Sequence, residues 1–129
     1  MRRCTIISDV KIVVVDKDKL AREFTVDVLE FCINRSVKAF ERCNEAWEYI
    51  RSNGSNAHIV ITESDLPEMT GFDLLAKIKT SYPEKTCIIM SQSHTHEKQA
   101  EDLGADAFLA KPFYVDEIFE IVQRYVIQQ

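Results

Sequence analysis

Residues 59–75 have the sequence IVITESDLPEMTGFDLL, and this stretch decides the fold. It begins inside a continuous apolar run, residues 58–62, of the kind that forms a buried strand, and the acid Glu63 follows directly. After a polar loop, Thr70 and Asp73 have the spacing of a capping box, in which each side chain bonds the backbone of the other. We therefore predict a strand, a loop and a helix that begins near Thr70 and ends before Pro83.

The same alternation of short apolar runs and helical periods continues in both directions. Strands are predicted at residues 11–15, 37–40, 58–62, 86–90 and 107–110. Helices are predicted from residue 18 to about 32, then at 44–51, 70–82, 94–103 and 115–127. Strict alternation of strands and helices indicates an α/β fold, in which helices cover both faces of a parallel sheet.

The helical periods also predict which side chains face the core. On the first helix we expect Leu20, Phe24, Val28 and Cys32 to form one inward face. On the second and last helices the predicted inward residues are Ala46, Trp47 and Ile50, and Ile118, Val122 and Tyr125. The helix at 94–103 is poor in apolar residues, so little burial should hold it and we expect it to be mobile.

Composition limits the class of protein. The chain has 129 residues, 46% of them hydrophobic, which fits one domain: we predict an irregular leader at residues 1–8 and a single domain at 9–129. A formal charge of −5 argues against binding nucleic acid or an anionic membrane, and no apolar run approaches the roughly 18 residues of a membrane span.

The cysteines and the first residues are consistent with a cytoplasmic protein, and the histidines do not indicate a metal site. None of the four cysteines forms a C-x-x-C pair, so we predict buried free thiols and a reducing compartment. The first residues lack the apolar segment of a signal peptide. The three histidines, His58, His94 and His96, do not have the spacing of a metal site, and we expect them to be exposed to solvent.

Polar residues follow four of the predicted strands, where a parallel sheet of this kind forms its ligand site. In chain order they are Asp16, Lys17 and Asp18; Glu63 to Asp65; Ser91; and Lys111 with Pro112. The simplest interpretation is that the acids cap nearby helices, and Asp18 has the position of an N-cap. A lysine followed by proline at one strand end, matched by acids at the others, favours a shared site instead.

These residues resemble the receiver domain of bacterial two-component response regulators. The resemblance rests on KIVVVDKD at 11–18, IVITESDLPEMTGFDLL at 59–75, IIMSQS at 88–93 and GADAFLAKPF at 104–113, and it covers about residues 9 to 127. It implies a flavodoxin-like fold with a doubly wound five-stranded parallel sheet of strand order 2-1-3-4-5 and five helices. It also implies a Mg²⁺-dependent aspartyl-phosphate switch fed by a histidine kinase.

The resemblance assigns roles to particular positions. Asp16 matches the first of two acids that position Mg²⁺, but Lys17 stands in place of the second, and Asp18 matches the next position. Glu63 stands where the family has the aspartate that accepts the phosphoryl group, and Asp65 matches the residue whose backbone carbonyl binds the metal.

The remaining family positions are retained. Ser91 matches the switch hydroxyl that follows the phosphoryl group, and Phe108 matches the aromatic ring that changes rotamer with it. Lys111 matches the lysine that pairs with phosphate, and Pro112 matches its usual proline neighbour, commonly after a cis bond. The departures from the family pattern are therefore confined to the acidic part of the site.

Both departures weaken phosphoryl chemistry. Lys17 removes an oxygen ligand, and an ammonium ~5 Å from Mg²⁺ would repel it by roughly 6–7 kcal/mol at an effective dielectric of about 20. Glu63 is one methylene longer than the family's aspartate, which displaces the attacking oxygen. We therefore predict a pseudo-receiver: a non-enzymatic signalling module that acts by protein–protein interaction, with no metal or cofactor expected. Glu63 would either mimic a phosphoryl group in part or form an ion pair with Lys17 or Lys111.

Two alternative functions can be considered for a protein with this sheet topology. A phosphorylation-competent response regulator would bind Mg²⁺ through Asp16, Glu63 and Asp65 and receive phosphate from a histidine kinase. A flavin-binding protein would need a hydroxyl- or glycine-rich phosphate loop after the first strand, which residues 17–20 do not provide. In receivers the face made by the fourth helix, fifth strand and fifth helix is a common docking or dimer surface, so we expect a kinase, an effector or a second copy of the chain there.

Overall fold

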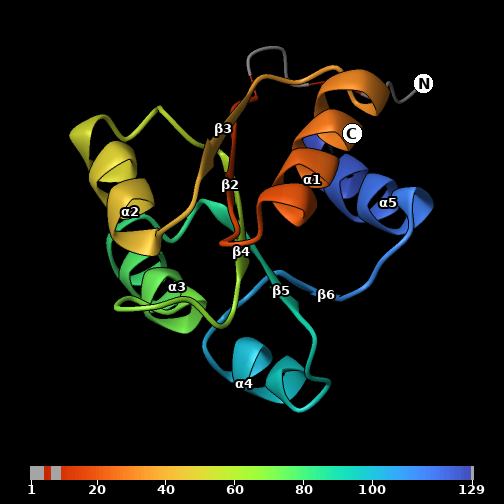
Figure 1. The fold of residues 1–129 in the computed structure, drawn as a ribbon. Coiled ribbons are helices and arrows are strands. Elements are labelled where there is room, and N and C mark those ends of the chain that lie inside the picture. The colour runs from red at the N-terminus through yellow and green to blue at the C-terminus, as the bar shows by residue number, and fades with distance from the viewer. Residues whose placement is uncertain (1–4, 7–9, 129) are drawn as a thin grey trace.

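The computed structural model describes residues 5–6 and 10–128 and contains a five-stranded parallel sheet (Figure 1). Its strands, in spatial order, are β3 (Val37–Phe40), β2 (Ile12–Val15), β4 (Ile59–Glu63), β5 (Thr86–Ser91) and β6 (Ala107–Ala110). When these five strands are counted along the chain, the order is 2-1-3-4-5. The predicted fold class and strand order are therefore confirmed.

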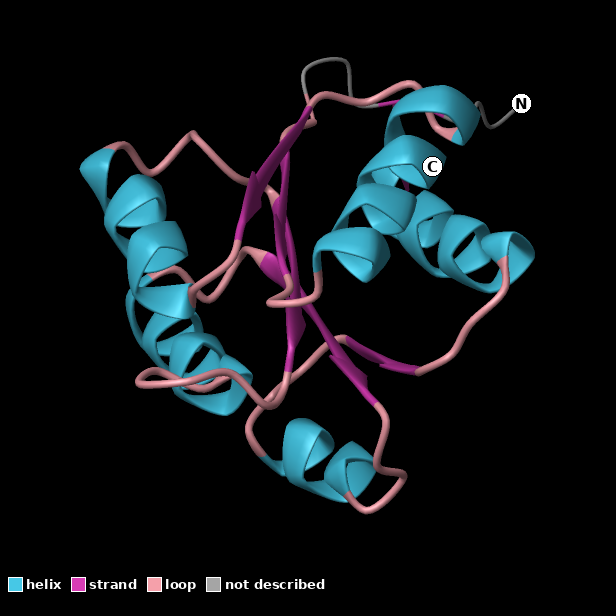
Figure 2. Cartoon of the chain, viewed as in Figure 1, coloured by secondary structure: helices cyan, strands magenta, loops and turns pink. Residues whose placement is uncertain are grey.

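Helices cover both faces of the sheet (Figure 2). They are α1 (Lys19–Cys32), α2 (Cys43–Ser52), α3 (Gly71–Ser81), α4 (His96–Asp102) and α5 (Val115–Val126). Helices α1 and α5 lie together on one face, α2 and α3 lie together on the other, and α4 lies beyond the lower end of the sheet in this view. Each predicted helix is present, within a few residues of its expected ends.

The core forms two layers, one on each face of the sheet. In β2, Val13 and Val15 belong to the layer under α2 and α3, and Ile12 and Val14 belong to the layer under α1 and α5. Because successive side chains of a strand point to opposite faces, a strand buried on both faces needs apolar residues at every position. This requirement explains the continuous apolar runs in the sequence.

The predicted inward face of α1 was wrong in part, because of its four residues only Val28 is buried. Leu20 is 77% exposed and Phe24 is 40% exposed, whereas the buried residues of this helix are Thr25, Val28 and Leu29. The reason is geometric: each step of four residues advances about 40° beyond a full turn, so a series from Leu20 to Cys32 winds about 120° around the helix. Cys32 is accordingly exposed.

The other inward faces follow the prediction more closely. Ala46 and Ile50 of α2 are buried, and so are Ile118 and Val122 of α5. Trp47 and Tyr125 are half-buried at the margins of the two layers. In α4 only Ala100 is buried, which agrees with the few apolar residues in its sequence.

The two ends of the chain differ from prediction. Thr5–Ile6, in the segment expected to be irregular, form strand β1, which pairs antiparallel with β7 (Ile127–Gln128). As a result, α5 ends at Val126 and not at residue 127. A pairing of two residues is too short to leave a periodic signal in sequence. The remainder of the predicted leader lies outside the described residues.

Cys43 and Cys87 are buried free thiols, as predicted, and Cys4 lies outside the described residues. Burial raises the pKa of Cys43 to about 11 and that of Cys87 to about 12, so both thiols stay protonated and unreactive near neutral pH. Within the described part of the chain, no helix is both long and apolar enough to cross a lipid bilayer.

Candidate functional site

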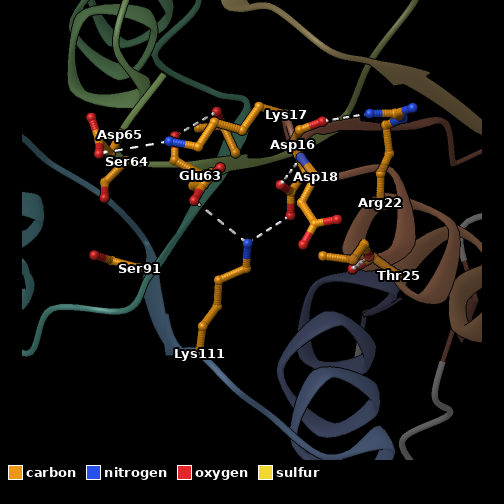
Figure 3. Close-up of polar contacts among 12 residues, drawn as sticks. Asp16, Lys17, Asp18, Arg22, Thr25, Glu63, Ser64, Asp65, Ser91 and Lys111 are labelled. Atoms are coloured by element: carbon orange, nitrogen blue, oxygen red, sulfur yellow. Dashed lines mark hydrogen bonds and ion pairs between the residues drawn. The ribbon is translucent and has the colours of Figure 1, made fainter. Parts of the chain in front are cut away.

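Three charged side chains converge at the carboxyl ends of β2, β4 and β6 (Figure 3). Lys111 Nζ lies 2.7 Å from Asp16 Oδ2 and 3.7 Å from Glu63 Oε1. The Asp16 side chain is fully buried, and those of Glu63 and Lys111 are each only 10% exposed. The parallel sheet therefore brings residues that are far apart in sequence into one ion cluster, with an ammonium between two carboxylates.

The backbone around Asp16 fixes its position. Asp16 Oδ1 accepts a hydrogen bond from the Asp18 backbone N–H at 3.0 Å, and Arg22 Nη1 donates to the Asp16 carbonyl at 2.8 Å. With Oδ2 facing Lys111, both carboxylate oxygens of Asp16 are engaged. Asp18 is the N-cap of α1, and its side chain accepts a hydrogen bond from the Leu20 N–H at 3.0 Å.

Glu63 ends β4 with its carboxylate in an unusual environment. Its Oε2 is buried and has no hydrogen-bond partner among the described residues. Burial raises the pKa of Glu63, the nearby Lys111 ammonium lowers it, and the charge of Asp16 raises it further, so the net shift is upward. Two carboxylates share one ammonium here, so a proton on Glu63 would leave the cluster electrically neutral.

Lys17 does not join the cluster. Its Nζ lies 3.7 Å from Asp65 Oδ2, and both side chains face solvent, with 49% and 81% of their surfaces exposed (Figure 3). Of the two ion pairs considered for Glu63, the structure therefore contains the one with Lys111 and not the one with Lys17. An exposed pair such as Lys17–Asp65 contributes little to stability.

Cationic side chains lie next to the carboxylates of this site. Both oxygens of Asp16 already accept hydrogen bonds, Lys111 lies between Asp16 and Glu63, and Lys17 replaces the second acid. Asp65 faces solvent and pairs with Lys17. Magnesium is usually bound by one or two carboxylates with several waters, and Glu63 Oε2 is a carboxylate oxygen without a hydrogen-bond partner among the described residues. No cluster of three His, Cys, Asp or Glu side chains suited to a metal occurs within residues 10–128.

His96, at the start of α4, is part of the site, although the sequence predicted it to be exposed to solvent. Its Nδ1 lies 2.8 Å from Ser91 Oγ and 3.0 Å from Ser64 Oγ, and its ring meets Phe72 edge to face at 5.3 Å. The expectation that His94 and His96 are both exposed therefore holds for His94 only. One feature of the sequence indicates His96: it follows Ser91, a serine at a strand end, by five residues.

The backbone after Glu63 contacts three other elements. The Ser64 N–H donates to the Met90 carbonyl of β5 at 2.8 Å, and the Ser64 carbonyl accepts from the Gly71 N–H of α3 at 3.0 Å. A Cβ atom on Gly71 would lie 2.0 Å from the Glu63 carbonyl oxygen, so only glycine allows this approach. Together with the Ser64–His96 bond, these contacts connect the end of β4 to β5, α3 and α4.

The remaining predicted residues lie at the same end of the sheet. Phe108 in β6 is half-buried against the core layer that contains α2 and α3. The Lys111–Pro112 peptide bond is cis, and the Lys111 N–H donates to the Ser91 carbonyl at 2.8 Å. The predicted rotamer switch of Phe108 remains a prediction.

A family model described as "Response regulator receiver domain" matches residues 12–123. The chain belongs to this family. The match spans all five strands of the sheet and every residue of the ion cluster, so the resemblance seen in the sequence is confirmed at the level of the family.

Curated relatives show the same similarity. The chain is 35% identical over 77 residues to the rice two-component response regulator ORR3, covering 57% of this chain and 59% of that protein. It is 31% identical over 118 residues to the DNA-binding transcriptional regulator NtrC of Proteus hauseri, covering 88% of this chain and 24% of that protein. The match thus spans less than two thirds of each relative's own length.

Solved structures show the same fold. The receiver protein TrrA from Thermotoga maritima, determined with Mg²⁺ and BeF, has a TM-score of 0.82 at 22% identity, covering 90% of this chain and 98% of that one. Chemotaxis protein CheY4 from Vibrio cholerae has a TM-score of 0.81 at 20% identity, covering 92% and 99%. At these identities the comparisons establish the fold alone.

Proposed function

We propose that this receiver domain is a non-enzymatic signalling module that works through protein–protein contacts and does not use the usual Mg²⁺-dependent phosphorylation. The observation behind the proposal is the position of Lys111, whose ammonium lies between Asp16 and Glu63 at 2.7 and 3.7 Å. The ammonium thereby offsets one of the two carboxylate charges without a divalent ion or a phosphoryl group. In Mg²⁺-dependent phosphorylation, the phosphoryl group brings negative charge to this location and the divalent ion balances it.

Glu63 is better described as an ion-pair partner than as a mimic of a phosphoryl group. A mimic would attract the switch hydroxyl, but Ser91 Oγ forms a hydrogen bond with His96 Nδ1 and accepts another from the Ser93 N–H. Glu63 also carries at most one negative charge, whereas a phosphoryl group has a charge of about −1.5 to −2. We infer that Glu63 and Lys111 keep the domain in one fixed state.

The proposed partner is a signalling protein, either a kinase or an effector, that docks on the face formed by α4, β6 and α5. Exposed apolar side chains occur at this face: Leu103 after α4, and Tyr114 and Val115 at the start of α5, with 37%, 77% and 42% of their surfaces exposed. Contiguous exposed apolar patches mark protein contacts, and Tyr114 and Val115 are adjacent in the chain. A homodimer through the same face is the alternative.

A phosphorylation-competent regulator is the second candidate. One observation favours it: Glu63 Oε2 is buried and has no hydrogen-bond partner among the described residues, so this oxygen remains available. Ser91 and Lys111 are also in place at the same rim. Phosphorylation of Glu63 would require Lys111 to move away from Asp16, with Mg²⁺ taking its place.

Treatment with acetyl phosphate and Mg²⁺, followed by intact-protein mass spectrometry, distinguishes the two. We expect no stable phosphoryl addition to the wild-type chain. The double variant Lys17→Asp/Glu63→Asp restores both missing acids and is the positive control, because it should gain a phosphoryl group under the same conditions. Stoichiometric labelling of the wild-type protein at Glu63 would reject the proposal in favour of the second candidate.

A further inference from the structure

A second cavity lies at the opposite end of the sheet, at the amino ends of β2 and β3, which are at the top of Figure 1. Its volume is about 580 Å³, within the usual range for sites that hold small molecules. Polar side chains from four separate segments line it: Lys11, Asn34, Arg35, Lys38, Tyr49 and Asn56. None of them belongs to the receiver site described above.

The charge of this cavity contrasts with that of the whole chain. Lys11, Arg35 and Lys38 line it, and no Asp or Glu among the described residues does, although the chain has a net charge of −5. Among residues 10–128, none of these three cations takes part in an ion pair, whereas most other lysines and arginines of the chain do. Three cations without a carboxylate produce a local positive potential that attracts anions.

Arg35 has an unused donor at this location. Its Nη1 donates to the Asn34 carbonyl at 3.2 Å, but its Nε is buried and has no hydrogen-bond partner in the described part of the chain. A buried N–H without an acceptor costs free energy, so an acceptor from outside the protein would be favoured there. Guanidinium N–H groups are well suited to phosphate oxygens, which they can bind in pairs.

Tyr49 provides an aromatic surface in the lining of the cavity. Lys38 Nζ lies 5.8 Å from the centroid of the Tyr49 ring, so a cation and an aromatic face are adjacent. Asn56 Nδ2 donates to the Tyr49 carbonyl at 2.9 Å, and this bond holds the segment after α2 against the helix. A ligand here could contact the cations with an anionic group and Tyr49 with a planar group.

We propose that this cavity binds a small phosphorylated molecule, with Arg35, Lys11 and Lys38 contacting the phosphoryl group. A phosphate ester fits better than a carboxylate because its charge of about −1.5 to −2 matches several cations at once. The site is independent of Glu63 and Lys111, so its occupancy would give the domain an input that does not pass through the phosphorylation site.

Titration of the ¹⁵N-labelled protein with adenosine 5′-monophosphate, followed by NMR, tests the proposal. We expect saturable shifts of the amides of residues 34–38, weaker saturable shifts with inorganic phosphate, and none with adenosine. Arg35→Gln should weaken binding at least about tenfold, because it removes a charge-assisted bond. Arg35→Lys keeps the charge but lacks Nε, and should also bind more weakly than wild type.

Lys98→Gln is the matched control, since Lys98 is an exposed lysine of α4 outside the cavity. It removes the same charge and should leave the affinity unchanged. The proposal is overturned if adenosine monophosphate causes no saturable shift at residues 34–38, or if Lys98→Gln weakens binding as much as Arg35→Gln does. Amide spectra of each variant, recorded before titration, establish that it is folded.

Discussion

Lys111 and Asp16 form a 2.7 Å ion pair in which the aspartate is entirely buried and the lysine nearly so. The two residues are 95 positions apart in sequence, so the pair exists only when β2 and β6 occupy the same sheet. Removing one partner of a buried pair leaves a charge without compensation, which is more costly than the pair itself is stabilising. The pair therefore makes Lys111 a structural residue as well as a candidate for function.

Lys111→Met should lower the free energy of unfolding by about 3–5 kcal/mol at neutral pH. The substitution leaves Asp16 and Glu63 close together without a cation, and the two carboxylates then repel each other. Urea denaturation followed by circular dichroism measures the change. Lys98→Met, at an exposed position, should alter stability by less than about 0.5 kcal/mol. Equal effects of the two substitutions would show that the buried pair has no special importance.

Glu63→Gln should change how stability depends on pH. The pKa of Glu63 is raised above its ordinary 4.5, so the folded protein holds this proton more tightly than the unfolded chain does. The stabilisation of the fold by this proton is therefore complete below about pH 4.5, and it is lost as pH rises through the pKa of Glu63 in the folded protein. Glutamine cannot ionise, so the variant should match wild type at low pH and be more stable at pH 7–8.

Thermal unfolding of wild type and Glu63→Gln between pH 4 and 8 measures this difference. Glu101→Gln is the control, because Glu101 is an exposed acid of α4. Its curve should run parallel to that of wild type. If Glu63→Gln were the less stable protein at pH 8, the ionised Glu63–Lys111 pair would be stabilising, and the upward pKa shift would be wrong.

The sequence was a better guide to the sheet than to the site. Short apolar runs located the strands of the main sheet, although Lys38 interrupts the run in β3. The Thr70–Asp73 capping box is present as predicted, with both of its hydrogen bonds. The helix faces were less accurate, since spacing by four residues misplaced Leu20 and Phe24. The β1–β7 pairing was not foreseen, because two residues produce no periodic pattern.

Side-chain partners within the site could not be read from residue order. Lys17 is adjacent to Asp16 in sequence, yet it forms an ion pair with Asp65 at the surface. The amine that contacts Asp16 is that of Lys111. His96 appeared to be a solvent-exposed histidine because its helix is polar. Its role depends on where the β5–α4 loop directs the ring, which is a property of the folded loop.

His96→Ala should loosen α4. The imidazole is the side chain that connects this helix to Ser64 and Ser91, and only Ala100 of α4 is buried. We expect a loss of about 1–2 kcal/mol in the free energy of unfolding and faster hydrogen exchange across residues 94–103. His94→Ala, two residues earlier and exposed, should leave exchange unchanged. Similar exchange rates in the two variants would contradict the proposed role of His96.

Gly71→Ala should destabilise the protein by about 3 kcal/mol, because the new Cβ would lie 2.0 Å from the Glu63 carbonyl oxygen and force β4 and α3 apart. Gly54→Ala is the matched control, since its Cβ would meet only the Tyr82 ring at 3.4 Å. Chemical denaturation of both variants measures the difference. A Gly71→Ala protein as stable as Gly54→Ala would mean that the close approach is easily relaxed.

The contacts of Ser64 have a mechanical consequence. The backbone N–H and carbonyl of Ser64, next to Glu63, are bonded to β5 and α3, and the Ser64 side chain is bonded to α4. A binding protein that pulled either helix outward would strain the same short segment and shift the acid beside it. A binding protein could therefore alter the ion cluster without covalent modification. In the reverse direction, a change at the cluster would alter the binding of that protein.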